Sequence, residues 1–230
     1  ALKRVTEQHI FDATSSAKAN LYALQSQINP HFFHNMLSVI ASLAEEGDNE
    51  KIVTVCGKLS QNLRYVSSFS ETEVPLSDEV NNAISYLELM RIRYEEKLEY
   101  NIQYVGDDSV PLVPKFILQP LLENSFRNGF KKAFPWRLFL EVYTAPDLWY
   151  VELTDNGTGV DAAALEKIRG KVEQIKKEST QLIIEELKIG GLSIPNICMR
   201  LFLLYRENMI FEVDSVQGEY FQIRIGGRLN

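Results

Sequence analysis

Apolar residues recur in steps of three and four over the first third of the chain, which is the spacing of helices that bury one face. One series comprises Leu21, Leu24, Ile28, Phe32, Met36, Val39 and Leu43, and a second comprises Ile52, Val55, Leu59, Leu63 and Val66. Between the two series lies EEGDNE, in which Gly47 suits a helix C-terminus and Asp48 or Asn49 suits the next N-cap. This pattern predicts two helices that fold back on each other as an antiparallel hairpin.

Two such helices have too little apolar surface to cover each other's stripe. If each hairpin packs against a second copy of itself, the four helices form a bundle that buries both stripes. The sequence therefore predicts a homodimer.

The pattern changes at SETEVPLSDEV, residues 70–80, where Pro75 is expected to end an extended segment and Ser77 to cap a helix that continues through residues 85–94. Beyond this point, alternating or continuous apolar runs predict strands at 98–105, 137–143, 148–154, 209–215 and 220–225, with helices at 114–130 and 194–205. We expect an α+β fold in two domains, helical over 1–72 and, over 73–230, one sheet with helices on one face. The charged stretch 167–180 is predicted to be a solvated, mobile segment that could serve as a lid over the site.

Composition narrows the possible functions. The 230 residues carry a formal net charge of -7 and an isoelectric point near 5.1, which argues against a nucleic-acid partner. The two cysteines, Cys56 and Cys198, form no CxxC pattern and indicate neither a disulfide framework nor a zinc site. No apolar run approaches the roughly 20 residues that cross a bilayer. Because the chain begins at Ala1 without a methionine and within a helical pattern, we interpret it as the cytoplasmic portion of a longer membrane protein, with membrane helices expected upstream.

SQINPHFFHNML, residues 26–37, places a proline inside the first helical pattern. Pro30 lacks an amide proton and crowds the carbonyl of Ser26, at a cost of about 3 kcal/mol in a helix interior. One interpretation is that the resulting kink turns His31 outward as a nucleophile, with Asn35 on the same face to orient its ring. The plainer interpretation, an interfacial histidine beside an accidental kink, is favoured when these residues are considered alone.

The nearby histidines predict no metal site. His31 and His34 lack the glutamate and the four-residue spacing of HExxH, no third ligand cluster is visible, and His9 lies in a plain helical lead-in. We expect His34 to face solvent or to pack on a neighbour.

Three further stretches carry candidate chemistry. In DNGTGV, residues 155–160, the glycines permit close backbone approach to a ligand, and Asp155 can accept a hydrogen bond from an exocyclic amine. In LLENSFRNGFKK, residues 121–132, Asn124 and Asn128 share a helix face suited to magnesium or phosphate oxygens, with Glu123 as a possible base. IGGLSIPNICMRL, residues 189–201, leads a glycine pair into a helix N-terminus that can receive phosphate. Taken singly, the first is more often a surface turn, and the second resembles an ordinary polar helix face.

Taken together and in this order, these motifs resemble the LytS/YesM-like branch of sensor histidine kinases over about residues 18–226. QINPHFFHNML is similar to the phosphoacceptor box of that branch, and PKFILQPLLENSFRNGF to its N box. DNGTGV is similar to the G1 box and GLSIPNICMRL to the G2 box. The combination is far more specific than any single motif, and it reverses the preference for a plain histidine at position 31.

The resemblance implies a kinase core in which a dimeric hairpin carries the phosphoacceptor His31 and a GHKL (Bergerat-type) domain binds ATP and Mg²⁺. Matched by position, Asp155 bonds the adenine amine, Gly157 and Gly159 form the turn beneath it, and Asn124 holds the magnesium ion. The other implied nucleotide-binding positions are Asn128, Gly191, which begins the phosphate-side loop, and Ser193. The phosphoryl group then passes to an aspartate on the receiver domain of a response regulator.

Some positions depart from the family pattern. Asn128 stands where the N box usually has histidine, Ser193 replaces the second G2 glycine, and GEYF, residues 218–221, replaces the usual GxGT. Serine needs more room and tolerates fewer backbone angles than glycine, which predicts weaker wrapping of the phosphates.

The leading hypothesis is an ATP-dependent protein-histidine kinase, in which neutral His31 attacks the γ-phosphate and Glu123 or Asn35 orients the imidazole. A rival is a degenerate core that acts as a dimeric signalling scaffold with weak or no ATP turnover. A hydrolysing ATPase is disfavoured, because it has no use for the NPHFFHN helix.

Overall fold

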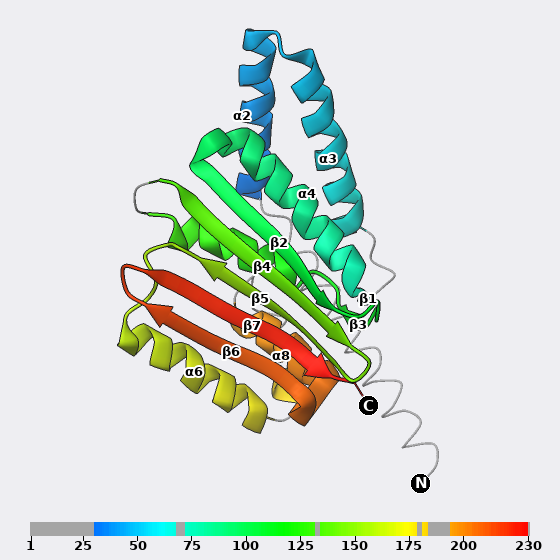
Figure 1. Cartoon of the computed structure of the whole chain (residues 1–230), viewed down its shortest axis with the longest axis vertical. Coiled ribbons are helices and arrows are strands. Elements are labelled where there is room, and N and C mark those ends of the chain that lie inside the picture. Colours follow the sequence, from blue (N-terminus) through cyan, green and yellow to red (C-terminus); the bar gives the residue numbers. More distant parts are fainter. Residues whose placement is uncertain (1–29, 68–71, 132–133, 179–180, 184–193, 230) are drawn as a thin grey trace.

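The computed structural model describes residues 30–67, 72–131, 134–178, 181–183 and 194–229. The chain begins there with a hairpin of two long helices, α2 (Pro30–Glu46) and α3 (Asn49–Ser67), which stand side by side in Figure 1. Gly47 ends α2 with a φ of +76°, a left-handed conformation that glycine adopts without steric cost. Asp48 caps α3, since its Oδ1 accepts a hydrogen bond from the amide of Lys51 at 3.1 Å. The predicted hairpin and its turn are confirmed.

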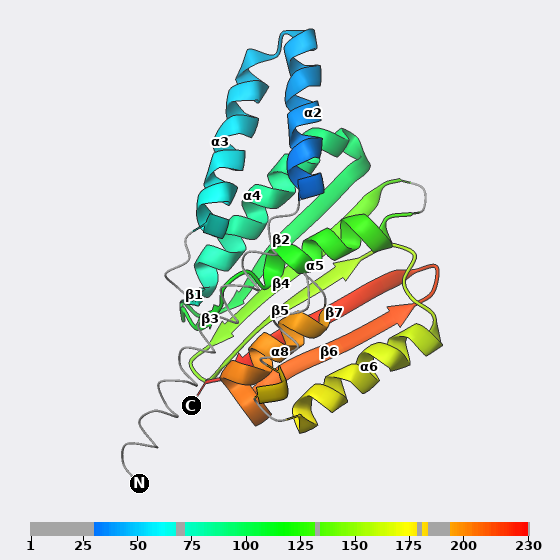
Figure 2. The same cartoon turned by 180° about the vertical axis from the view of Figure 1, so that it is seen from behind.

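A five-stranded sheet follows, with the strand order β2-β4-β5-β7-β6. Its strands are β2 (Leu98–Gly106), β4 (Trp136–Ala145), β5 (Leu148–Asp155), β6 (Met209–Val216) and β7 (Tyr220–Arg228). β2 and β4 pair in parallel, and every other pair in the sheet is antiparallel. Seen from behind in Figure 2, the helices lie in front of the sheet on one face only. The predicted α+β fold is therefore confirmed.

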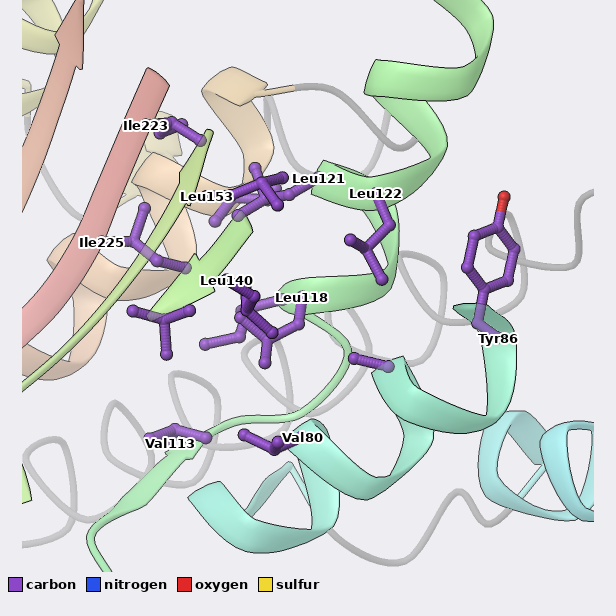
Figure 3. Close-up of a cluster of buried hydrophobic side chains, with 14 of the residues drawn as sticks. Val80, Tyr86, Val113, Leu118, Leu121, Leu122, Leu140, Leu153, Ile223 and Ile225 are labelled. Atoms are coloured by element: carbon purple, nitrogen blue, oxygen red, sulfur yellow. The ribbon is translucent and has the colours of Figure 1, made fainter. Parts of the chain in front are cut away.

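The helices over this face enclose the core. They are α4 (Leu76–Tyr94), α5 (Leu118–Asn124), α6 (Ala162–Lys177) and α8 (Ile194–Tyr205), and the π-helical turn η2 (Ser125–Gly129) continues α5. Short elements connect these helices and the strands: β1 (Glu73–Pro75), β3 (Leu112–Pro114), η1 (Glu95–Lys97) and η3 (Arg206–Asn208). Figure 3 shows Leu118 and Leu122 of α5 directed at Leu140 of β4, with Val80 of α4 beneath them. Each such buried side chain contributes roughly 1.5–3 kcal/mol of transfer free energy.

Three predictions about local structure are wrong. The charged segment at 167–180 is not a solvated lid over its described part, because residues 162–177 form α6, capped by Asp161 and packed through Leu165, Val172 and Ile175. Ser77 does not cap α4, which begins one residue earlier with no side-chain cap. The helix expected over 114–130 begins only at Leu118, because the chain before it runs through β3 and a buried turn.

That turn is held by a buried carboxylate. Glu79 of α4 is fully buried and accepts hydrogen bonds from the amides of Phe116, Ile117 and Leu118, the latter two at 2.7 and 3.0 Å. The hydroxyl of Tyr65 on α3 donates to the same carboxylate. Burial, followed by the charge of Glu79, raises the pKa of Tyr65, so this hydroxyl stays protonated. One side chain therefore joins the hairpin, α4 and the start of α5.

The carbonyls of the same turn are bound from the opposite side. Phe116 has a φ of +65°, a strained conformation for a residue with a side chain. Arg200 of α8 donates to its carbonyl at 3.2 Å and to that of the preceding residue, Lys115. Buried Lys115 in turn lies 4.7 Å above the ring of Tyr65. The strained backbone persists because charged groups bind it on both sides.

A second polar contact joins the hairpin to α5. The side-chain amides of Asn62 on α3 and Asn82 on α4 both donate to Oε1 of Gln119, each at 3.0 Å, and all three residues are buried. Since buried amides are costly to leave unpaired, these contacts fix how the hairpin meets the sheet domain.

Neither cysteine is bonded, and no helix in the described ranges combines the length and apolarity of a membrane span. Cys56 is exposed on α3, whereas Cys198 is buried in α8. Burial raises the pKa of the Cys198 thiol to about 12, so it stays protonated at neutral pH.

Substituting Glu79→Ala leaves three buried amides without an acceptor. We expect the free energy of unfolding, measured by urea denaturation, to fall by about 3 kcal/mol or more. The matched control is Glu88→Ala in the same helix, which removes only a partly exposed ion pair with Lys58 and is expected to cost less than about 1 kcal/mol. Equal losses in the two variants would contradict this role for Glu79.

Candidate functional site

The histidine motif lies at the start of the hairpin, and its helix has one buried and one exposed face. Phe32 and Met36 are buried, whereas His31 and His34 are exposed. Asn35, one turn after His31, is half-buried, and its Nδ2 lies 3.1 Å from Nδ1 of the His31 ring. Pro30 is the first described residue, so the predicted kink, with Ser26 and His9, lies outside the described residues.

The contact with Asn35 controls which ring nitrogen of His31 is available. The oxygen and nitrogen of an asparagine amide exchange places when the group turns by 180°, so this contact can form in two ways. When Nδ1 carries the proton and donates it to the amide oxygen, Nε2 keeps its lone pair and faces solvent. The pair of residues can thus present an exposed, neutral imidazole with a defined nucleophilic nitrogen.

Asp155 ends β5 on the helix-covered side of the sheet and is 1% exposed. Its Oδ2 accepts a hydrogen bond from the hydroxyl of Ser125 at 2.6 Å, and its Oδ1 accepts one from the amide of Gly157 at 2.9 Å. Both oxygens are acceptors, as in an ionised carboxylate held in one orientation. Ser125 was missed by the sequence analysis, and its place one residue after Asn124 in the N-box-like helix was the only available signal.

The loop after Asp155 is fixed at both ends by close backbone contacts. A Cβ placed on Gly157 would lie 2.5 Å from the carbonyl oxygen of Gly129, which itself accepts a hydrogen bond from the amide of Thr158 at 2.8 Å. Gly159 has a φ of +57°, and a Cβ placed on it would lie 2.3 Å from the carbonyl oxygen of Val216, at the end of β6 next to the turn into β7. The DNGTG loop therefore lies between the end of η2 and this turn, and only glycine fits at the two positions.

Asn124 and Asn128 lie one turn apart at the end of α5 and in η2. The Nδ2 of Asn128 donates to Oδ1 of Asn124 at 2.7 Å, so the two amides form one polar group, half-buried at Asn124 and exposed at Asn128. Half-buried Glu123 points elsewhere along the helix, and its Oε1 accepts a hydrogen bond from Gln119 at 3.0 Å. Of the two residues expected to orient the imidazole, Asn35 is the one seen in contact with it.

The remaining predicted site residues are placed less completely. Gly191 and Ser193 lie outside the described residues. Within GEYF, Gly218 turns the chain with a φ of +85°, and its amide donates to the carbonyl of Thr158 at 2.7 Å. Tyr220 points away from the helices, where its hydroxyl donates to Asp214 at 2.6 Å. This turn thus supports the DNGTG loop through its backbone.

A hollow of about 340 Å³ lies on the other face of the sheet. Its lining includes Glu99, Arg137, Phe139 and Thr154, whose side chains alternate with the buried Leu138 and Leu153 and so point to the uncovered face. Asp155 also lines this hollow, while its carboxylate accepts hydrogen bonds from Ser125 and Gly157, so the hollow and the candidate site meet at this residue.

The family model and the relatives found by comparison with known proteins agree with one another. Residues 19–98 match the family model for histidine kinases. The sensor protein LytS of Bacillus cereus is 30% identical over 207 residues, covering 89% of this chain and 33% of that protein. The sensor histidine kinase YesM of Bacillus subtilis is 29% identical over 171 residues, covering 74% of this chain and 30% of that protein. The chain thus spans about a third of the length of these curated relatives.

Among solved structures, the Acinetobacter baumannii histidine kinase AdeS aligns with 83% of this chain and 83% of its own. The sequence identity is 12% and the TM-score is 0.44.

Alanine substitutions at Gly157 and Gly170 are expected to have opposite effects on the free energy of unfolding. A methyl group on Gly157 collides with the Gly129 carbonyl, whereas a methyl group on Gly170, in α6, meets nothing within 4 Å. We expect Gly157→Ala to lower the free energy of unfolding by about 1–3 kcal/mol and Gly170→Ala to raise it by about 0.5–1 kcal/mol. Urea denaturation of both variants measures the difference, and a neutral Gly157→Ala variant would refute the packing described for this loop.

Proposed function

The chain belongs to the LytS/YesM-like sensor histidine kinases, and from this membership we propose that it is an ATP-dependent kinase core that phosphorylates its own His31. One observation carries the proposal: an exposed histidine with an orienting asparagine lies in the same folded chain as a fixed aspartate and a pair of asparagines on an α/β domain. The phosphoryl group then passes to an aspartate on the receiver domain of a response regulator.

The donor atoms of the second site fit a magnesium nucleotide. The Asp155 carboxylate, aligned by Ser125 and Gly157, offers acceptors of the kind that bind an exocyclic amine. The side-chain amides of Asn124 and Asn128 offer neutral oxygens, which are ligands that Mg²⁺ accepts. When bound, MgATP supplies the γ-phosphoryl group, and the cation offsets the negative charge on its oxygens.

The chain itself positions the reacting groups and supplies the electron pair of one imidazole nitrogen. When the Asn35 amide is turned so that its oxygen faces Nδ1 of His31, Nδ1 donates its proton to that oxygen, which leaves the lone pair of Nε2 available to the phosphorus. The bond from Nε2 to the γ-phosphorus forms while the bond from that phosphorus to the β-phosphate oxygen breaks, and ADP leaves with the bonding electrons. Because the imidazole is exposed, its Nδ1 proton can then pass to water.

The surface of the hairpin supports the proposed homodimer. Leu37 on α2 is 57% exposed, and on α3 Val53 and Leu63 are 72% and 40% exposed. A second hairpin packed on these residues would complete a four-helix bundle and leave His31 at its flank.

Labelling with γ-labelled ATP and magnesium tests the kinase. We expect an acid-labile, alkali-stable label on the wild-type protein that disappears in His31→Gln and persists in the matched control His34→Gln. Loss of the Asn35 contact in Asn35→Ala is expected to slow labelling by about fivefold to tenfold. Asn101→Ala, at an exposed position on β2, is expected to leave the rate unchanged.

The same assay separates the alternatives. Label that survives His31→Gln would eliminate the proposed acceptor. Nucleotide binding without any label would support a degenerate signalling scaffold, and release of free phosphate without labelled protein would support an ATPase.

Leu37→Glu tests the dimer surface. A charge placed on an exposed leucine costs little in a monomer but is expected to break a bundle packed on it, lowering the mass measured by light scattering to that of one chain. Val110→Glu is the matched control, since Val110 is 59% exposed and lies in the loop before β3, outside the hairpin. A dimer that tolerates both changes would place the interface elsewhere.

A further inference from the structure

A continuous row of aromatic rings joins the acceptor helix to the nucleotide-side helix. The ring of Phe32 on α2 lies 5.1 Å from that of Tyr86 on α4, measured between centroids, and Tyr86 lies 5.9 Å from Phe126 in η2. Phe32 and Tyr86 are each 2% exposed. Figure 3 shows Tyr86 at the edge of the core, beyond α5. We call Phe32, Tyr86 and Phe126 the aromatic bridge.

Each end of the aromatic bridge is next to a proposed functional group. Phe32 directly follows His31, so their Cα atoms are about 3.8 Å apart. Phe126 lies midway between Asn124 and Asn128, whose amides are hydrogen-bonded to each other. Two ring contacts therefore separate the helix turn that carries the acceptor from the helix turn that carries the candidate magnesium ligands.

The bridge is anchored within the sheet domain. Phe126 also contacts Phe130, with the rings edge to face at 5.4 Å, and Phe130 stacks on Trp136 of β4 at 5.0 Å. Offset and edge-to-face pairs of this kind add directional attraction to the burial of apolar area. The acceptor helix is thus fixed against a rigid cluster of rings.

The face of α2 that makes the bridge differs from the face proposed for the dimer. Phe32 contacts Tyr86 of α4, Leu37 is exposed to solvent, and at 3.6 residues per turn His31 lies between the directions of these two side chains. The buried contact of Phe32 with Tyr86 holds the helix turn that carries His31 against the sheet domain of its own chain.

We infer that phosphoryl transfer takes place within one protomer, with Tyr86 as the positioning residue that seats His31 against the Asn124 site of its own chain. The inference rests on the proposed kinase function and specifies its geometry. In the step itself, the bond between the γ-phosphorus and ADP breaks and the bond to His31 of the same chain forms. Holding both groups on one folded unit makes the reaction effectively unimolecular.

Mixed dimers decide between transfer within and between protomers. A dimer of one His31→Gln chain and one Asn124→Ala chain, purified with two different tags, contains no chain with both functional groups. We expect it to remain unlabelled, while a dimer of a wild-type chain and a doubly substituted chain keeps about half of the wild-type label. Label on the Asn124→Ala chain would show transfer between protomers and overturn the inference while leaving the kinase function intact. An unlabelled wild-type dimer would instead contradict the kinase function, and the inference with it.

The role of Tyr86 is tested by separating nucleotide affinity from the rate of transfer. We expect Tyr86→Leu to lower the labelling rate at saturating ATP by about tenfold, with the KM for ATP changed by less than about twofold, because the bridge positions the acceptor and does not touch the nucleotide. Tyr86→Phe keeps the ring and is expected to restore the rate. A Tyr86→Leu protein that melts near the wild-type temperature and labels at the wild-type rate would refute this role.

Discussion

The carboxylate of Glu79 is the constraint on which the arrangement of this molecule depends. A buried charge is stable only where several donors surround it, and here they come from Tyr65 on the hairpin and from three consecutive amides at the start of α5. The position of α5 therefore depends on both the hairpin and α4. Since Asn124 and Ser125 follow at the end of α5, the same carboxylate also determines where the candidate nucleotide ligands lie. A rotation of α3 that removes the Tyr65 hydroxyl from Glu79 would also change the contacts of the turn before α5, where Phe116 already has a strained backbone.

Much of the fold could be predicted because its signals are local. Strands such as β5 alternate strictly between buried and half-buried residues, and the hairpin turn carries both a glycine and a capping aspartate. The prediction failed at α6, where lysines and glutamates on the exposed side obscured the widely spaced Leu165, Val172 and Ile175. It also failed at residues 114–117, since the reason they are not helical is a contact with Glu79, some 37 positions earlier in the chain.

In the candidate site, too, contacts between neighbours in the sequence could be predicted and contacts between distant positions could not. Neighbours one helical turn apart, such as His31 with Asn35 and Asn124 with Asn128, follow from spacing alone and are in contact in the structure. The partner of Asp155 did not follow, because Ser125 is 30 residues away and a serine carries little information about its contacts. Tyr86 was equally invisible, since its helical position predicts only a core residue. The chemical groups can be listed from the sequence, but the contacts that hold them depend on the folded chain.

The surroundings of the two tryptophans give the molecule an optical property. Trp149 is fully buried, and its indole donates a hydrogen bond to Tyr205 at 2.9 Å, far from the ring cluster. Trp136 is half-buried and stacks on Phe130, one ring away from Phe126. These two are the only tryptophans in the sequence, so the tryptophan fluorescence comes from Trp149, in a constant environment, and from Trp136, beside the N-box-like helix. Quenching by a water-borne solute such as iodide therefore acts on Trp136 and spares Trp149, so solvent access to the ring cluster can be followed without attaching a dye.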